Sequence, residues 1–192
     1  MPQFSGIITC WTAFVLLCNM LGLDRKSIEL VPHQTEWKSL FESEADLLRE
    51  ILGDYNVAIE HIGSTAISGL EAKPIIDILL GVQKLEDAEK CIVPLARIGY
   101  EYRGEQGIVG RFYFRKGTAD VSTHHLNIVE MTSEFWRGHL LFRDYLRQHA
   151  DAAQSYGELK RGLALKHKGN RPAYTEAKAD FIKSVLEKAA AS

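Results

Sequence analysis

The feature that most constrains the fold is the apolar run over residues 74–82, which contains one carboxylate, Asp77. A run this short, apolar on both of its sides, predicts a central strand that is buried on both faces. A carboxylate is costly to bury unless a cation or a basic side chain meets it. The carboxylate is therefore either a metal ligand in a cleft or the partner of Lys73, Arg111 or Arg115.

The turn that leads toward this strand is Gly63-Ser64, followed directly by Thr65. It lies between an expected strand and an expected short helix, so backbone N–H groups at the start of the helix can donate hydrogen bonds to a phosphate. A strand carboxylate can hold the magnesium ion that accompanies nucleotide phosphates. Gly63, Ser64 and Thr65 are therefore candidate phosphate-binding residues, and Asp77 is the candidate magnesium ligand. For Gly-Ser alone, a plain turn is the alternative.

The position two residues after Asp77 matters, because alternate side chains of a strand face the same way. That position holds Leu79, so the strand offers no second acid beside the first. The turn and the single carboxylate indicate nucleotide chemistry, whereas the leucine favours binding without transfer.

Basic residues for a triphosphate are expected on the strand over residues 111–115. Arg111 and Arg115 share one face of that strand, since they are an even number of positions apart. Together with Lys73 they are the candidates to hold the triphosphate charge.

Histidines provide the candidate proton carrier. On the strand expected over residues 121–129, His125 shares a face with Asn127, and it lies beside Asp77 if the two strands are neighbours. Because imidazole changes charge near neutral pH, His125 is a candidate catalytic residue. His61, just before the turn, either orients a phosphate or ends its strand, and we favour the structural role.

The remaining apolar pattern predicts an α+β (α/β) chain: a mixed sheet with flanking helices and a helical C-terminal part. The expected strands cover residues 28–31, 57–62, 74–82, 100–102, 111–115 and 121–129. The expected helices cover residues 35–52, 85–98 (bent or ended early by Pro94), 134–149 (capped by Ser133), 151–168 and 173–190, and residues 65–70 are expected to form a short helix or turn.

Composition limits the partners. A formal net charge of −2 over 192 residues gives no overall attraction to nucleic acid or to an anionic membrane. One basic cluster is either a solvated helix face, which we favour, or a site for a triphosphate or an RNA backbone: Lys160, Arg161, Lys166, His167, Lys168 and Arg171. The three cysteines lack disulfide or zinc spacing, which predicts a reduced, cytoplasmic setting.

The segment over residues 1–23 contains no charged side chain. We expect an extension that precedes a start at Met20, a membrane anchor just long enough to cross a bilayer, or a packed helix, and we favour the extension. The folded domain is expected over residues 28–190.

Several blocks in a fixed order resemble the GrpB family, a branch of the nucleotidyltransferase superfamily, and the domain attached to some bacterial dephospho-coenzyme A kinases. The blocks include Val31-Pro32 with Trp37, Glu60-His61-Ile62-Gly63-Ser64-Thr65-Ala66, Lys73-Pro74-Ile75-Ile76-Asp77-Ile78, Thr123-His124-His125-Leu126, Phe142-Arg143-Asp144-Tyr145-Leu146-Arg147, Tyr156 with Leu159-Lys160, and Tyr174-Thr175 with Ala177-Lys178. The resemblance covers residues 28–187 and implies a nucleotidyltransferase-like mixed β-sheet.

The resemblance also implies a chemistry. Superfamily members that transfer nucleotides have a Gly-Ser turn, two acids separated by one residue, and a third acid on a neighbouring strand, which together hold two magnesium ions. Ser64 and Asp77 match that pattern, whereas Leu79 departs from it. Asn127 is a second departure, since relatives read His-Leu-His there.

Two hypotheses follow. The first is a magnesium-dependent nucleotidyltransferase acting on a nucleoside triphosphate and an unidentified acceptor. The second is a catalytically silent nucleotide-binding or accessory module. A second acid beside the first, from Glu60, Asp120 or Glu130, would favour transfer, and an apolar and basic ring would count against it.

Overall fold

The structure, a computed structural model, describes residues 21–25, 27–53 and 58–191. The strands are β1 (Leu23–Asp24), β2 (Ala58–Ile62), β3 (Ile76–Val82), β4 (Tyr100–Tyr102), β5 (Phe112–Gly117) and β6 (Val121–Glu130). The helices are α2 (Glu36–Leu52), the 3-10 turn η1 (Ser64–Ala66), α3 (Glu86–Lys90), α4 (Ile92–Arg97), α5 (Glu134–Gln148), α6 (Ala150–Lys166), α7 (Arg171–Glu176) and α8 (Ala179–Ala190).

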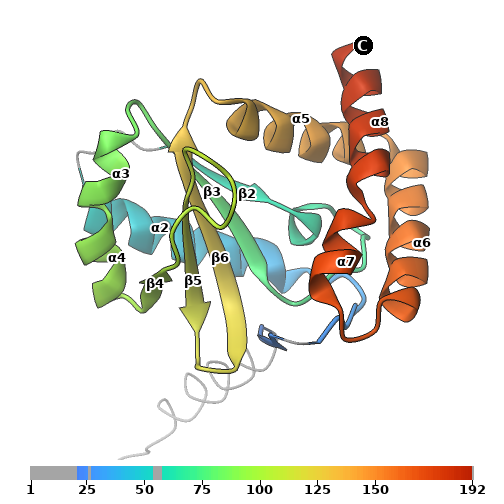
Figure 1. The fold of residues 1–192 in the computed structure, drawn as a ribbon, viewed down its shortest axis with the longest axis horizontal. Coiled ribbons are helices and arrows are strands. Elements are labelled where there is room, and N and C mark those ends of the chain that lie inside the picture. Colours follow the sequence, from blue (N-terminus) through green and yellow to red (C-terminus); the bar gives the residue numbers. More distant parts are fainter. Residues whose placement is uncertain (1–20, 26, 54–57, 192) are drawn as a thin grey trace, which may run out of the picture.

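One mixed sheet forms the centre of the fold (Figure 1). Its strand order is β2-β3-β6-β5-β4, and β1 pairs with the start of β6. The pair β3 and β6 is parallel, and the other described pairs are antiparallel. The expected α/β class with a mixed sheet and flanking helices is therefore confirmed.

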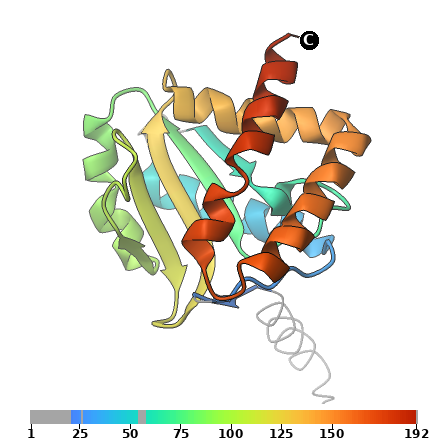
Figure 2. The same ribbon diagram turned by 45° about the vertical axis from the view of Figure 1, so that its right-hand side comes forward.

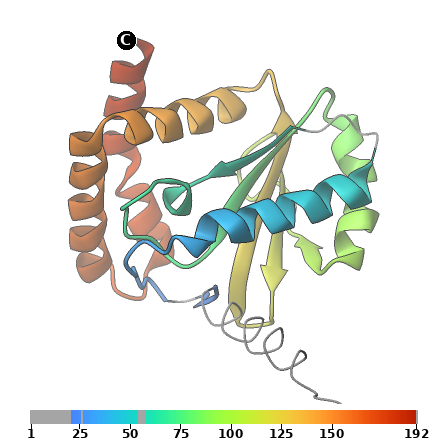
Figure 3. The same cartoon turned by 180° about the vertical axis from the view of Figure 1, so that it is seen from behind.

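The main hydrophobic core lies on one face of the sheet, where α2 runs across the strands (Figure 3). Ile76, Ile78 and Leu80 of β3 all point into this core and have no exposed surface. Trp37 of α2 and Leu95 of α4 pack against them, also without exposure. Burying each such large side chain stabilises the fold by about 1.5–3 kcal/mol, so this face provides much of the stability.

The opposite face is covered by the C-terminal helices, with α8 crossing in front of α5 in Figure 2. Phe135 and Trp136 of α5 pack on Leu79 and Val129 at one end of the sheet. As predicted, Ser133 caps α5, since its Oγ accepts a hydrogen bond from the Trp136 N–H at 3.2 Å. The helices therefore leave the region around Asp77 to be lined by α6 and α7.

Three elements in the structure differ from those predicted from the sequence. Residues 28–31 form no strand; Val31 makes a single bridge to Ala72. The helix expected over residues 85–98 is divided at Cys91, because the ring of Pro94 opposes the carbonyl of the residue four positions earlier. The helix expected over residues 173–190 is divided into α7 and α8, with Lys178 at the break.

The predictions for the N-terminal segment fall mostly on residues 1–20, including Met20, which lie outside the described residues. At the end of that segment, Leu23 belongs to β1 and pairs with Ser122. Across the described ranges, every helix is too short or too polar to cross a membrane.

Candidate functional site

The parallel pairing of β3 with β6 brings two candidate residues together. Asp77 is in register with His125, and His125 Nδ1 lies 3.0 Å from Asp77 Oδ1. Residues in register share a face of the sheet, so both side chains leave the main core and face α6 and α7. The structure thus places His125 beside Asp77, while its catalytic role stays a prediction.

Gly63 lies directly against the Asp77 carboxylate. Its φ of 72° is in the left-handed region, and a Cβ on this residue would collide with the carboxylate of Asp77. Glycine is therefore required here both by the backbone conformation and by the close approach. Ser64 follows at the start of η1, so the turn and the carboxylate form one wall.

A cavity of about 130 Å³ lies in front of this wall. Gly63, Ser64, Thr65, Asp77 and His125 line it on the sheet side. Three lysines from separate parts of the chain line it as well: Lys73 before β3, Lys160 of α6, and Lys178 between α7 and α8. Three lysines that line one cavity with a single carboxylate suit it to an anion such as a phosphate chain.

Lys160 is the most buried of these cations, with 2% exposure. Its Nζ donates hydrogen bonds to Ser64 Oγ at 3.0 Å and to the carbonyl of Glu71. The same Nζ lies 5.0 Å from the centre of the Tyr156 ring, a cation–π distance. The lysine therefore connects α6 to the turn while its ammonium lines the cavity.

Burial lowers the pKa of each lysine in the cavity. For Lys160, burial and then the nearby charge of Lys178 bring the pKa to about 7. For Lys73, burial and then the charge of Arg171 bring the pKa to about 8. Lys178 shifts in the same direction, with burial again the main cause. An anion entering the cavity would relieve this crowding of like charges.

Asp77 is held in its charged form. Burial by itself raises the pKa of the carboxyl group, but the hydrogen bond from His125 and the charges of His125 and Lys73 outweigh it. The pKa of Asp77 is consequently below its ordinary value. An anionic carboxylate is the form that a metal ion requires.

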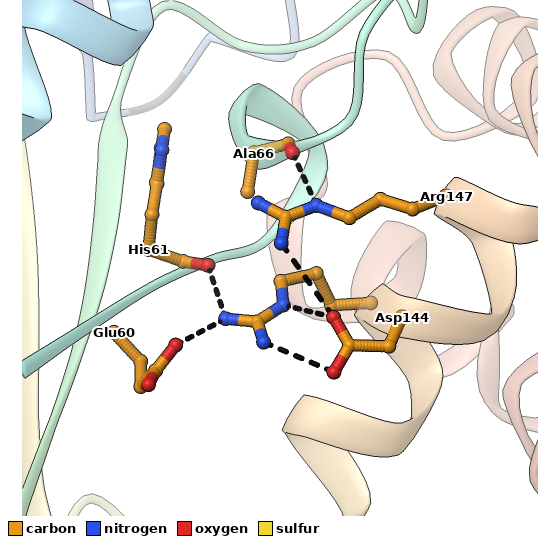
Figure 4. A network of polar contacts seen from close by, with 6 residues as sticks. Glu60, His61, Ala66, Asp144 and Arg147 are labelled. Atoms are coloured by element: carbon orange, nitrogen blue, oxygen red, sulfur yellow. Dashed lines mark hydrogen bonds and ion pairs between the residues drawn. The ribbon is translucent and has the colours of Figure 1, made fainter.

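A polar network anchors the turn to α5 (Figure 4). Its members are Glu60, His61, Ala66, Arg143, Asp144 and Arg147. Arg143 donates to the Glu60 carboxylate at 2.6 Å and to the His61 carbonyl at 3.1 Å. Arg147 donates from Nε to the carbonyl of Ala66, the last residue of η1, at 3.0 Å. The two arginines therefore hold β2 and η1 on either side of Gly63.

His61 supports the turn from the side of the main core. Its Nε2 lies 3.0 Å from Thr65 Oγ1, and its ring stacks on Phe41 with 4.5 Å between ring centres. Burial lowers the pKa of His61 to about 4, so the imidazole is neutral at physiological pH. These contacts agree with the structural role favoured from the sequence.

The two candidate arginines lie outside the lining of the cavity. The Arg111 guanidinium donates to the carbonyl of Glu105 at 3.0 Å and to Asn127 Oδ1 at 3.3 Å. Arg115 forms an ion pair with Glu101. Both are engaged elsewhere, so the triphosphate contacts expected for them remain a prediction that the arrangement favours less than contacts from the lysines.

Leu79 is fully buried although it faces the same way as Asp77. It clusters with Ile62 and Val129, and Trp136 of α5 covers them. The leucine is therefore part of the packing under α5, and a carboxylate at this position would be buried among apolar side chains.

The site fits one magnesium ion better than two. Asp77 is the only carboxylate among the described residues that line the cavity. Of the other acids considered, Glu60 is bound by Arg143, and Glu130 accepts a hydrogen bond from the Leu85 N–H at 2.9 Å. Within the described ranges, no group of three or more His, Cys, Asp or Glu side chains could hold a metal. Magnesium often takes one carboxylate with phosphate oxygens and waters, which this site can provide with a nucleotide bound.

Two cavity residues, Lys160 and Lys178, were not singled out as site residues from the sequence. For the basic cluster that contains Lys160, the sequence favours a solvated face over a site for a triphosphate or an RNA backbone, and a solvated face describes the exposed Lys166 and Lys168 well. Tyr156, one helical turn before Lys160, was the available signal, since an aromatic residue at that spacing marks an inward-facing stripe.

Comparisons with known proteins show the family of the chain. A family model described as GrpB protein matches residues 27–188. The glutamate-rich protein GrpB of Alkalihalophilus pseudofirmus is 40% identical over 172 residues, covering 87% of this chain and 98% of that protein. The chain spans about half of two longer relatives: 54% of the YqkA protein of Bacillus subtilis, at 38% identity, and 46% of a dephospho-CoA kinase of Mycolicibacterium paratuberculosis, at 26% identity.

Solved structures show the same fold. A crystal structure of the conserved protein GrpB from Enterococcus faecalis aligns with a TM-score of 0.77 at 40% identity, covering 84% of this chain and 96% of that one. The Cid1 poly(U) polymerase aligns with a TM-score of 0.51 at 17% identity, covering 87% of this chain and 52% of that one. The second likeness concerns the fold alone, and it makes the sheet nucleotidyltransferase-like.

Proposed function

Since the chain belongs to the GrpB family and has a nucleotidyltransferase-like fold, we propose that it is a magnesium-dependent nucleotidyltransferase-type protein. Its substrates would be a nucleoside triphosphate and an acceptor hydroxyl or phosphate. The observation that carries the proposal is the convergence of three lysines and the Ser64 hydroxyl on Asp77. Two structures of the Cid1 poly(U) polymerase, with Mg 3'-dATP and with MgGTP bound, support the choice of ligand.

In this proposal the lysines hold the phosphate chain. Lys73, Lys160 and Lys178 each place an ammonium group at the cavity, and lysine binds phosphate as a point charge. Ser64 is oriented by Lys160 and adds a hydroxyl beside the turn. A phosphate chain in this position would lie against Gly63, where no side chain intervenes.

Asp77 would hold the magnesium ion together with the phosphate oxygens. When bound, the ion supplies charge neutralisation for the phosphates and for the leaving pyrophosphate. His125 keeps the carboxylate oriented through its Nδ1 contact. Asp77 and His125 are therefore the carboxylate and the histidine that line the proposed reacting centre.

The transfer step would form a bond between the acceptor oxygen and the α-phosphorus as the bridging bond to the β-phosphate breaks. Pyrophosphate then leaves with the electron pair, and the three lysines stabilise its charge. If His125 donates from Nδ1 to Asp77, its Nε2 is available to take the acceptor proton. Such a proton carrier would replace the third acid that two-metal enzymes use.

The test measures binding and turnover separately. Titration calorimetry with a non-hydrolysable MgATP analogue should show binding that weakens at least tenfold in Lys160→Met. In Asp77→Asn, the remaining affinity should no longer depend on magnesium. Lys166→Met changes an exposed lysine of the same helix and is the matched control, which should bind as the wild type does.

Pyrophosphate release in the presence of candidate acceptors tests the transfer half. Unchanged nucleotide affinity in both site variants would contradict the site. Tight binding with no release of pyrophosphate across alcohols, nucleosides and phosphate monoesters would contradict transfer, and it would favour the binding-module hypothesis instead. Circular dichroism establishes that each variant is folded before either conclusion is drawn.

A further inference from the structure

A larger pocket, of about 680 Å³, adjoins the lysine-lined cavity. Gly63 and Tyr156 line both spaces, so the pocket and the cavity meet at these two residues. The pocket lies between α5, α8 and the loop over residues 104–110. Its size falls within the range of small-molecule sites, and an occupant can contact Gly63, which also lines the cavity at Asp77.

The walls of this apolar pocket are mostly hydrocarbon. They are formed by Ile108, Val109, Val129, Phe135, Phe142 and Ile182, among others. Two polar side chains of the lining are already engaged within the protein: Ser133 caps α5, and Glu130 accepts a hydrogen bond from the Leu85 N–H. The pocket is therefore suited to an apolar group and poorly suited to the polar edge of a nucleobase.

The loop that forms one wall is held in place by polar contacts. Arg111 donates to the carbonyls of Glu105 and Gln106, and the Glu105 carboxylate accepts from the Gly110 N–H at 2.7 Å. The loop nevertheless presents Val109 with 91% exposure. Ile108 and Val109 of this anchored loop both line the pocket, so the loop provides a fixed apolar wall.

We propose that the apolar pocket holds the body of the acceptor, an alcohol with an aromatic or acyl group. Its hydroxyl would pass Gly63 and Tyr156 to reach the phosphate bound at Asp77. In this arrangement the lysine-lined cavity, of about 130 Å³, takes phosphate groups of the nucleotide, and the adjoining pocket takes the apolar group of the acceptor. The inference rests on the proposed function for the identity of the occupant, but the pocket itself can be tested without it.

Gly138 provides a way to fill the pocket without disturbing the protein. It lies on α5 in the pocket lining, and no atom lies within 4 Å of the place that a Cβ would take. Gly138→Leu therefore adds a side chain to open space at a helical position that tolerates it. Gly162 of α6 has the same open surroundings but does not line the pocket, so Gly162→Leu is the matched control.

The probe is N-phenyl-1-naphthylamine, a neutral aromatic dye whose fluorescence rises in apolar sites and which has no charge to attract the lysines. We expect saturable binding to the wild type and to Gly162→Leu, and at least a tenfold loss of affinity in Gly138→Leu. The MgATP analogue should not displace the dye. Lys160→Met should keep dye binding while losing the nucleotide, which separates this inference from the proposed function.

Three results would overturn the inference. Absence of saturable dye binding to the wild type would show that the pocket does not accept an apolar ligand. Equal affinity in Gly138→Leu would place the dye elsewhere. Displacement of the dye by the MgATP analogue would assign the pocket to the nucleobase rather than to the acceptor.

Discussion

The two faces of β3 have different roles: one packs in the main core, and the other borders the candidate site. On the core side, Ile76, Ile78 and Leu80 are packed without exposure beneath α2 and α4. On the other side, Asp77 borders a cavity lined by lysines, and Leu79, the next residue on that side, is buried under α5. The character of this second face changes within two residues, because α5 covers Leu79 and does not cover Asp77. The position that holds a second acid in two-metal nucleotidyltransferases can therefore hold an apolar residue here while the strand itself is unchanged.

The largest expected effect tests this boundary. Leu79→Asp restores the acid spacing of two-metal nucleotidyltransferases, but it places a carboxylate where α5 leaves no exposed surface. We expect the free energy of unfolding to fall by about 4 kcal/mol or more, measured by urea denaturation. Leu79→Met, which nearly conserves volume, should cost less than about 1.5 kcal/mol. A stable Leu79→Asp variant with stronger magnesium binding would show that α5 moves aside at this position.

A smaller effect is expected on the core side of the same strand. Ile78→Ala removes buried methyl groups beneath α2 and should lower the free energy of unfolding by about 3 kcal/mol. Nucleotide affinity, measured on the folded fraction at low temperature, should stay within twofold of the wild type. Affinity that falls in step with stability would mean that the two faces of β3 are not separable.

The smallest effect is the pH dependence of nucleotide binding. The pKa values of Lys160 and Lys73 are about 7 and about 8, so the two ammonium groups lose their protons between about pH 6 and pH 9. Since the protonated forms attract phosphate, affinity for the MgATP analogue should fall by about tenfold across this range. In Lys160→Met, calorimetry should show only the decrease in affinity that is centred near pH 8, which comes from Lys73. A flat profile in the wild type would mean that neither lysine contacts the phosphates.

Much of the fold was accessible from local patterns. The apolar run around Asp77 predicted a central strand, and the Gly63-Ser64 turn was placed between a strand and a short helical segment, as the structure shows. The parity of residues along β6 also identified His125, rather than His124, as the histidine on the side of Asp77. These inferences succeeded because side-chain alternation and the conformational freedom of glycine are properties of a few consecutive residues.

Other features depended on distant packing. The sequence by itself determined the strand, the turn, the single carboxylate and the family, because each depends only on consecutive residues or on the order of short motifs. Only the tertiary structure decided which cations surround Asp77: Lys160 lies 96 residues after Ser64, and it reaches the turn because α6 packs beside it. A lysine on an amphipathic helix has the same sequence context whether it faces solvent or a cavity. Its environment, and hence its pKa, follows from the position of the helix, which no local pattern records.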